Sequence, residues 1–182
     1  MADLQRTYMW LYGCFVSLVA AVLYVYCTAS PYWYRIAEDP EAHGGLWYEC
    51  ERNFDVDEIS CNDILLVGVQ AYIHFARAFM IISSLLILCT LWTLVVAHVV
   101  KVLSNKLKIA GIVIMTSTVP VLIATVMYWS LKSDEMEKEH LNAEASHAVI
   151  LGWVSIPIAL VGGALLVVEH KRLLKQQGYL KL

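Results

Sequence analysis

The five cysteines and six histidines are the residues of this chain best suited to metal binding or covalent chemistry. Cys14, Cys27 and Cys89 lie inside apolar runs, where a free thiol usually serves as a small packing residue. Cys50 and Cys61 lie in a polar stretch, and an oxidising compartment would favour a disulfide between them. Such a bridge would constrain the unfolded chain and stabilise a small lobe by about 3 kcal/mol.

A metal site built on Cys50 and Cys61 is the weaker alternative, because no Cys-x-x-Cys pair or neighbouring histidine completes a tetrahedral set. The histidines are scattered, and the chain has neither a His-Glu-x-x-His nor a Gly-x-Ser-x-Gly sequence. It also lacks the glycine-rich loop of a nucleotide site. We therefore expect no enzymatic activity, no cofactor, no metal and no nucleic-acid partner.

The elements that carry these residues are expected to be membrane-spanning helices. Hydrophobic residues make up 59% of the chain and charged residues only 16%, too few charges to cover a soluble domain. Four apolar runs, at about 9–29, 76–100, 109–131 and 148–168, are long enough to cross a hydrocarbon core of about 30 Å. The first has no small-residue cleavage site after it, so we expect it to be retained as an anchor. The chain is predicted to be a single four-span domain over 1–182.

The charges between the runs predict the orientation. Segments 1–8, 101–108 and 169–182 hold eight lysines and arginines against two carboxylates, whereas 30–63 and 132–147 hold four against fourteen. Because lysine and arginine favour the cytoplasmic side, the first three segments and both termini are predicted to be cytoplasmic. Segments 30–63 and 132–147 are then acidic outer loops.

The first outer loop is predicted to form strands. Aromatic clusters around Trp33 and Trp47 are bounded by prolines and glycines, a pattern that favours a small antiparallel sheet. Residues 64–67 either supply its last strand or begin the second helix. The second outer loop is expected to be a short acidic cap that extends the third span.

One motif in the first loop resembles a known family. Trp33, the sequence Gly45-Leu46-Trp47, and Cys50 with Cys61 resemble the W…GLW…C…C signature of the claudin superfamily. This superfamily includes the peripheral myelin protein, the epithelial membrane proteins and the lens fibre membrane intrinsic protein. Residues 76–81 resemble the start of the family's second span, and 151–160 resemble the fourth span of its myelin and epithelial branch. The resemblance covers essentially the whole chain. It implies a left-handed bundle of four transmembrane helices with a small extracellular antiparallel β-sheet, held at the membrane surface by Trp33, Leu46 and Trp47.

Arg77 has two readings. It lies 24 positions before Lys101, about 36 Å along a helix, which places it near the outer boundary of the second span. A structural anchor is the first reading. The second is a role in ion passage, since arginines within membranes usually face a partner or a polar cavity.

The chain ends Gly178-Tyr179-Leu180-Lys181-Leu182, which resembles the Gly-Tyr-x-x-hydrophobic sorting signal of lysosomal membrane proteins. The natural killer cell granule protein of the same superfamily is similar in this respect. Gly178, Tyr179 and Leu182 would then bind sorting adaptors. A frayed amphipathic tail is the alternative.

Three functions remain open. The first is a non-enzymatic multi-pass protein of the plasma membrane that organises cell contacts or membrane domains, with lipid and like or unlike membrane proteins as partners. The second is a charge-selective pore former or channel-modulating subunit, because the outer loops are acidic. The third is an endolysosomal or secretory-granule membrane protein, which the tail would indicate.

Overall fold

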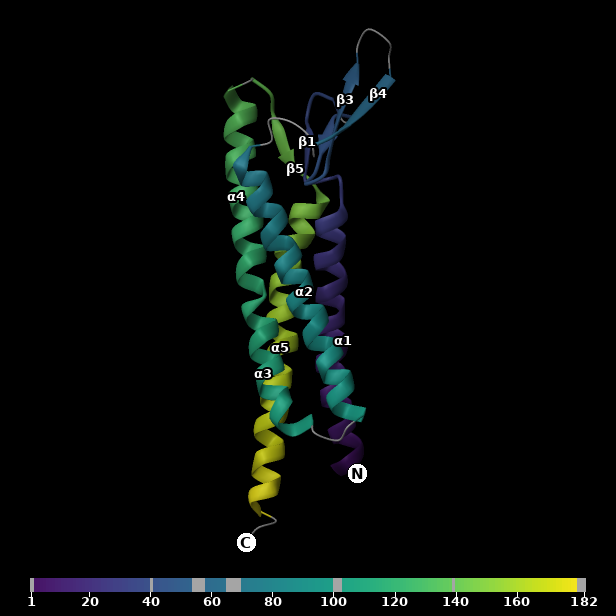
Figure 1. Cartoon of the computed structure of the whole chain (residues 1–182), viewed down its shortest axis with the longest axis vertical. Helices are drawn as coiled ribbons and strands as arrows, with labels where there is room; N and C mark the ends of the chain where they lie inside the picture. The colour runs from purple at the N-terminus through teal and green to yellow at the C-terminus, as the bar shows by residue number, and fades with distance from the viewer. Residues whose placement is uncertain are drawn as a thin grey trace. The chain divides into compact units, whose positions relative to one another are not determined.

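The structure is a computed structural model that describes residues 2–39, 41–53, 58–64, 70–99, 103–138 and 140–179. Helices account for most of these residues, and short strands form a small sheet (Figure 1). The helices are α1 Ala2–Ala29, α2 Ala71–Val99, α3 Leu103–Thr116, α4 Thr118–Lys138 and α5 His147–Tyr179. The strands are β1 Tyr34–Ile36, β2 His43–Gly44, β3 Tyr48–Asn53, β4 Glu58–Asp63 and β5 Ala143–Ala145.

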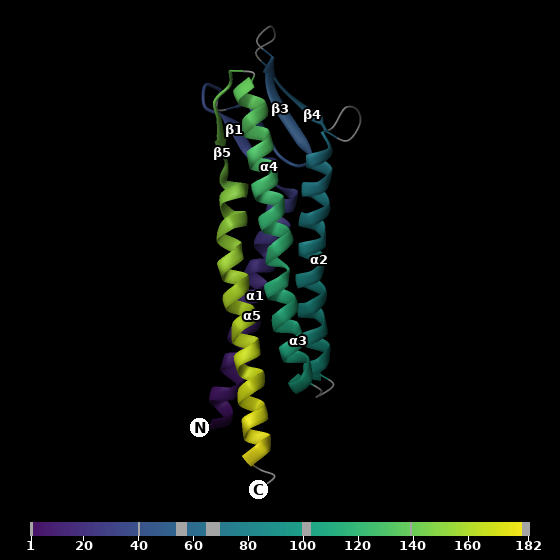
Figure 2. The same ribbon diagram turned by 90° about the vertical axis from the view of Figure 1, so that its left-hand side faces the viewer.

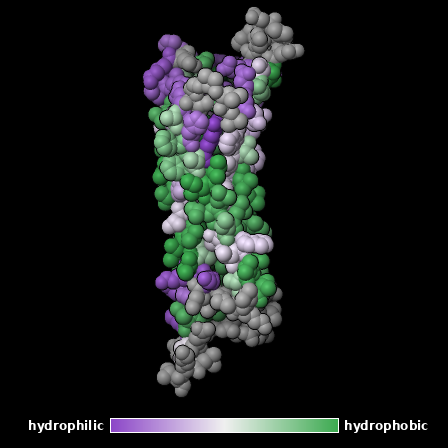
Figure 3. Space-filling view, in the orientation of Figure 1, coloured by the Kyte–Doolittle hydropathy of each residue, from purple (hydrophilic) through white to green (hydrophobic). Residues whose placement is uncertain are grey.

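Four helical stretches are long and apolar enough to cross a membrane: Met9–Ala29, Ala71–Val99, Lys106–Lys138 and His147–Lys175. In the view of Figure 3, hydrophobic residues cover most of the helical surface, and hydrophilic residues gather near the strands and in a smaller group away from them. Apolar side chains that would be costly to expose to water are stable against lipid. The predicted class, four membrane-spanning helices with a small antiparallel sheet, is confirmed.

The third span consists of two helices. α3 ends at Thr116 and α4 begins at Thr118, two residues before Pro120, which accounts for the break. A proline has no N–H to bond to the carbonyl four residues earlier, here that of Thr116, and its ring crowds that carbonyl. The hydroxyl of Ser117 is buried and donates to the Ile114 carbonyl at 2.7 Å.

The chain divides into two compact units, each with a part of every span. The first unit is Met1–Val22, Ile82–Val119 and Ser155–Leu182. In it, glycines allow close helix packing, because a Cβ added to Gly163 would lie 2.6 Å from the Gly111 carbonyl oxygen. The second unit is Leu23–Ile81 and Pro120–Val154, and it contains the whole sheet.

The sheet has the strand order β4-β3-β2-β1-β5, and every pair in it is antiparallel. β3 and β4 pair as a hairpin, and β5 lies beside β1 (Figure 2). In the β1–β5 pair, Arg35 lies opposite Glu144. The side chains of Arg35 and Glu144 form an ion pair of 2.6 Å across this edge. The second outer loop therefore contributes a strand to the sheet of the first.

The sequence did not predict these strands fully. β4 ends at Asp63, and Ile64 lies in a turn. Residues 65–67 lie outside the described residues, so the choice between a last strand and the start of the second helix stays open for them. α4 does extend into the second loop, to Lys138, but the expected cap also contains β5. Ala143–Ala145 has little strand propensity, and it becomes a strand because β1 offers a free edge.

Candidate functional site

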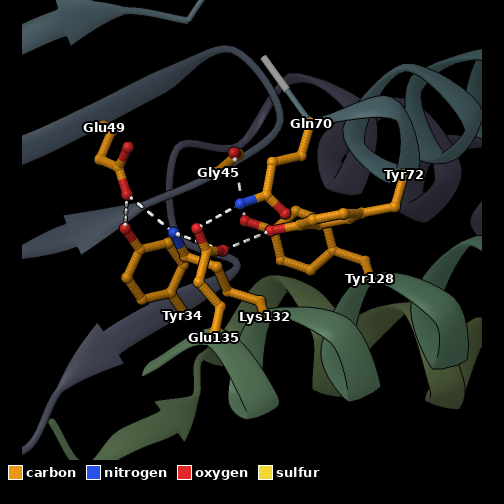
Figure 4. A network of polar contacts seen from close by, with 8 residues as sticks. All are labelled: Tyr34, Gly45, Glu49, Gln70, Tyr72, Tyr128, Lys132 and Glu135. Atoms are coloured by element: carbon orange, nitrogen blue, oxygen red, sulfur yellow. Dashed lines mark hydrogen bonds and ion pairs between the residues drawn. The ribbon is translucent and has the colours of Figure 1, made fainter. Parts of the chain in front are cut away.

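Lys132 is the centre of a polar network between the sheet and the helices of the second unit (Figure 4). It lies on α4 and is only 7% exposed. Its Nζ is 3.1 Å from Oε1 of Glu49 on β3 and 3.5 Å from Oε2 of Glu135. The ammonium also lies 4.8 Å from the centre of the Tyr34 ring. The buried cation therefore has two carboxylates and an aromatic face as partners.

Hydroxyl and amide donors complete this network around the two carboxylates. The Tyr34 hydroxyl donates to Glu49, and the Tyr72 hydroxyl donates to Oε2 of Glu135 at 2.8 Å. Gln70 donates to the other oxygen of Glu135 at 2.5 Å. The network joins β1 and β3 of the sheet to the start of α2 and to α4 (Figure 4).

Helical spacing explains why α4 supplies so many of these groups. Tyr128, Lys132 and Glu135 are spaced by four and three residues, which places them on one face of a helix. The Tyr128 hydroxyl donates to the Gly45 carbonyl at 3.3 Å, and the Tyr128 ring packs edge-on against Trp33 at 4.8 Å between centres. One face of α4 thus serves as the support of the sheet.

The electrostatics of the network favour the ionised form of Glu49. Burial raises the pKa of its carboxyl, but the hydrogen bond from Tyr34 and the charge of Lys132 outweigh burial and hold that pKa below 4.5. Burial, followed by the charge of Glu49, raises the pKa of Tyr34 far above its usual range. Tyr34 is therefore a neutral donor and Glu49 a charged acceptor at neutral pH.

This arrangement is suited to fixing parts of the chain together. Tyr34, Glu49, Tyr72, Lys132 and Glu135 direct their polar atoms at one another. Among the described residues, no group of three or more histidine, cysteine, aspartate or glutamate side chains could hold a metal ion. Buried charge that is paired and hydrogen-bonded in this way holds one geometry, because any displacement would leave a charge unpaired.

The predicted aromatic anchors bind the end of α1. Trp33 is fully buried, and its indole N–H donates to the Cys27 carbonyl at 2.8 Å. The indole N–H of Trp47 donates to the Thr28 carbonyl at 2.6 Å. Both tryptophans thus satisfy carbonyls of the last turn of α1, which have no partner within the helix.

Gly45, Leu46 and Arg77 meet at the same place. The Arg77 Nε–H donates to the Leu46 carbonyl at 2.6 Å, and the guanidinium carbon lies 4.9 Å from the centre of the Trp47 ring. A Cβ on Gly45 would lie 2.5 Å from the Ser30 carbonyl oxygen, so a side chain has no room there. These contacts favour a structural anchor over a role in ion passage for Arg77, because its guanidinium group is held against Leu46 and Trp47.

The predicted disulfide is present. Cys50 and Cys61 are bonded, and they are directly opposed in the β3–β4 hairpin. Both thiols are consumed by this bond, so the metal alternative has no ligands to use. The bridge joins the edge strand β4 to β3, which Glu49 connects to Lys132.

The predicted tail signal lies in the first unit. Gly178 and Tyr179 belong to the last turn of α5, and Leu182 lies outside the described residues. α5 continues well beyond 168, the expected end of the span, since leucine, lysine and glutamine are good helix formers.

The residues that sequence reasoning missed are those of the network: Tyr34, Glu49, Tyr72, Lys132 and Glu135. A weak signal was present in Lys132 and Glu135, whose spacing of three would pair them if the third span continued as a helix. Glu49 gave no such signal, because it is one of fourteen outer carboxylates and is 83 positions from Lys132 in the chain.

Comparison with known proteins agrees with this architecture. A sequence model of the PMP-22/EMP/MP20/Claudin family matches residues 7–166. The chain is 30% identical to the lens fiber membrane intrinsic protein of Bos taurus over 156 residues, which cover 83% of this chain and 85% of that protein. It is 23% identical to epithelial membrane protein 3 of Homo sapiens over 156 residues, 85% of this chain and 91% of that protein. The chain therefore belongs to the PMP-22/EMP/MP20/Claudin family.

Proposed function

We propose that this integral membrane protein organises cell contacts or membrane domains, without enzymatic activity, through the outer surface of its sheet. The observation that carries the proposal is that the two faces of the β3–β4 hairpin have different surroundings. Glu49 on one face is fixed to the buried Lys132. Tyr48 and Ile59 lie on the opposite face, because side chains alternate along a strand and residues paired across strands share a face.

The face with Tyr48 and Ile59 has the properties of a contact surface. Tyr48 is 48% exposed and Ile59 is 51% exposed, on a hairpin that the disulfide and the network hold in shape. Exposed apolar side chains on a rigid support bind at a low entropic cost, since little has to be ordered on contact. Like or unlike membrane proteins of a neighbouring cell would be the partners.

We further propose that both termini are cytoplasmic and that 30–63 and 132–147 face outward. The charge asymmetry of the sequence supports this orientation. The position of both loops in one sheet supports it too, because β1 and β5 can pair only if the two loops are on the same side of the membrane.

Aggregation of cells in suspension tests the proposal. Cells that express the chain would be mixed with cells that do not, and with each other, to separate unlike from like partners. Ile59→Asn is expected to reduce aggregate size in whichever mixture aggregates. Ser60→Asn is the matched control, since Ser60 is exposed on the other face of the same strand.

Aggregation that responds equally to both substitutions, at matched surface levels, would contradict the proposed contact face. Aggregates that never exceed those of cells without the chain would contradict the adhesive function itself.

A charge-selective pore or a channel-modulating subunit is the second candidate. The exposed Glu51 favours it, because this residue shares a face with Glu49 on an outer lobe rich in carboxylates. Sodium and chloride permeabilities across an epithelial layer would test it. Glu51→Gln should lower the preference for sodium if the lobe lines a pore.

For localisation, we propose the plasma membrane in preference to an endolysosome or secretory granule. Sorting adaptors read tyrosine signals as extended segments, whereas α5 is helical through Tyr179. Surface biotinylation of wild type and Tyr179→Ala, with endocytosis blocked and unblocked, tests this. A larger surface pool of the variant would favour adaptor binding and an endolysosomal itinerary.

A further inference from the structure

An apolar groove of about 360 Å³ lies between α1 and α5 in the first unit. Tyr12 and Phe15 line it from α1, and Pro157, Ile158 and Val161 line it from α5. Tyr12, Phe15 and Val161 are exposed in the chain itself. Inside a bilayer, an apolar concavity at this place would be filled by a hydrocarbon chain.

The same face of α5 changes from apolar to basic as it leaves the groove. Val161 and Val168 are exposed, and they are followed by the exposed Lys171, Arg172 and Lys175. Steps of seven, four and three residues lead from Val161 to Val168, Arg172 and Lys175, and Lys171 lies three residues after Val168, so these side chains form one stripe along the helix. The helix is continuous through the whole stripe.

The cations of this stripe are available to a ligand. Arg172 contacts the Met9 sulfur on α1, which places the guanidinium at the α1 side of α5, where the groove also lies. Within the described part of the chain, no ion pair engages Lys171, Arg172 or Lys175. Glu169, the carboxylate nearest to them in sequence, is buried. The stripe therefore has an excess of positive charge.

The distance between the groove and the cations matches one lipid leaflet. Arg172 follows Val161 by eleven residues, about 16 Å along a helix. Half of a hydrocarbon core is about 15 Å. A lipid whose phosphate lies at Arg172 would thus place the far part of an acyl chain in the groove.

We propose that the α1–α5 groove and the Lys171–Arg172–Lys175 stripe together bind one anionic glycerophospholipid. Its acyl chain occupies the groove, and its negatively charged headgroup pairs with Arg172 and Lys175. Charge complementarity selects an anionic headgroup, because its net negative charge is attracted to the three cations of the stripe, whereas a zwitterionic headgroup has no net charge. This lipid site goes beyond the proposed function. It does not depend on the contact face of the sheet, so either proposal can fail without the other.

Native mass spectrometry of the full chain tests the site. The chain would be purified in mild detergent and offered equal amounts of dioleoyl phosphatidylserine and dioleoyl phosphatidylcholine. We expect preferential binding of phosphatidylserine, and a loss of that preference by about ten-fold in the double variant Arg172→Gln, Lys175→Gln. The matched control is Lys106→Gln, Lys108→Gln, which removes the same charge from α3 and should keep the preference.

Equal binding of the two lipids by the wild type would overturn the site. An equal loss of the phosphatidylserine preference in both double variants would also overturn it, because any cation on the chain would then attract the lipid equally well. Ile158→Trp tests the groove, and it should lower the occupancy of both lipids. Unchanged occupancy in that variant would overturn the placement of the acyl chain. A dimer that forms without lipid and is lost in Ile158→Trp would assign the groove to a second copy instead.

Discussion

The Nζ of Lys132 lies 3.1 Å from Oε1 of Glu49, and this contact joins helix α4 to strand β3. The two residues belong to the two different outer loops of the sequence. Their pairing, with Glu135 and Tyr34 around it, makes the sheet and the helical parts of the second unit one supported structure. The proposed contact face depends on this support.

Replacement of Lys132 should loosen the sheet. Lys132→Met leaves Glu49 and Glu135 partly buried without their cation, and we expect a loss of about 2 kcal/mol in the free energy of unfolding. Thermal unfolding in detergent would measure it. Lys138→Met is the control, because Lys138 pairs with Asp134 at the exposed surface and its loss should change stability little. Equal melting temperatures for Lys132→Met and wild type would contradict the supporting role.

The stability of the sheet should depend on pH through Glu49. Its pKa in the folded chain is lower than its ordinary value of 4.5, so folding favours the ionised form. The stabilisation is fully present above that ordinary value and is lost as the pH falls through the lower, folded value. Thermal unfolding between pH 3 and 6 should therefore show a steeper loss in wild type than in Glu49→Gln. Parallel curves would refute this assignment.

Much of this architecture was predictable from the sequence, because the predicted features depend on residues that are close together in the chain. The spans follow from uncharged length, and the disulfide follows from two cysteines in outer loops. The anchoring of Trp33 and Trp47 was expected from the resemblance of their motif, and a structural anchor was one of two readings of Arg77 from its position near the end of the second span. The Lys132–Glu49 contact was not predictable, because nothing local distinguishes Glu49 from the other outer carboxylates. β5 was missed for the same reason, since its pairing with β1 and not its composition makes it a strand.

The Cys50–Cys61 bond should be necessary for a correctly shaped hairpin. Cys61→Ser is expected to destabilise the lobe by about 3 kcal/mol and to retain the chain inside the cell. Mass spectrometry of non-reduced peptides from surface protein should find the crosslink, and surface biotinylation should find less of the variant. Normal surface levels of Cys61→Ser would show that the network alone suffices.

The proposed orientation can be tested by labelling single introduced cysteines with a membrane-impermeant maleimide. Ser133→Cys lies in the second outer loop and should react in intact cells, whereas Ser104→Cys should react only after permeabilisation. The unaltered chain is the background control, because its three free cysteines are Cys14, Cys27 and Cys89 in the spans. Reaction of Ser104→Cys but not Ser133→Cys in intact cells would reverse the topology.

The most direct test of the contact face is photocrosslinking between cells that carry different tags. A photoreactive residue, p-benzoylphenylalanine, would replace Ile59 on the proposed contact face or Ser60 on the opposite face of β4. We predict crosslinks from position 59 to a protein on the neighbouring cell, and far fewer from position 60. Equal yields at the two positions, or none from position 59 at cell borders where the chain is abundant, would contradict the account.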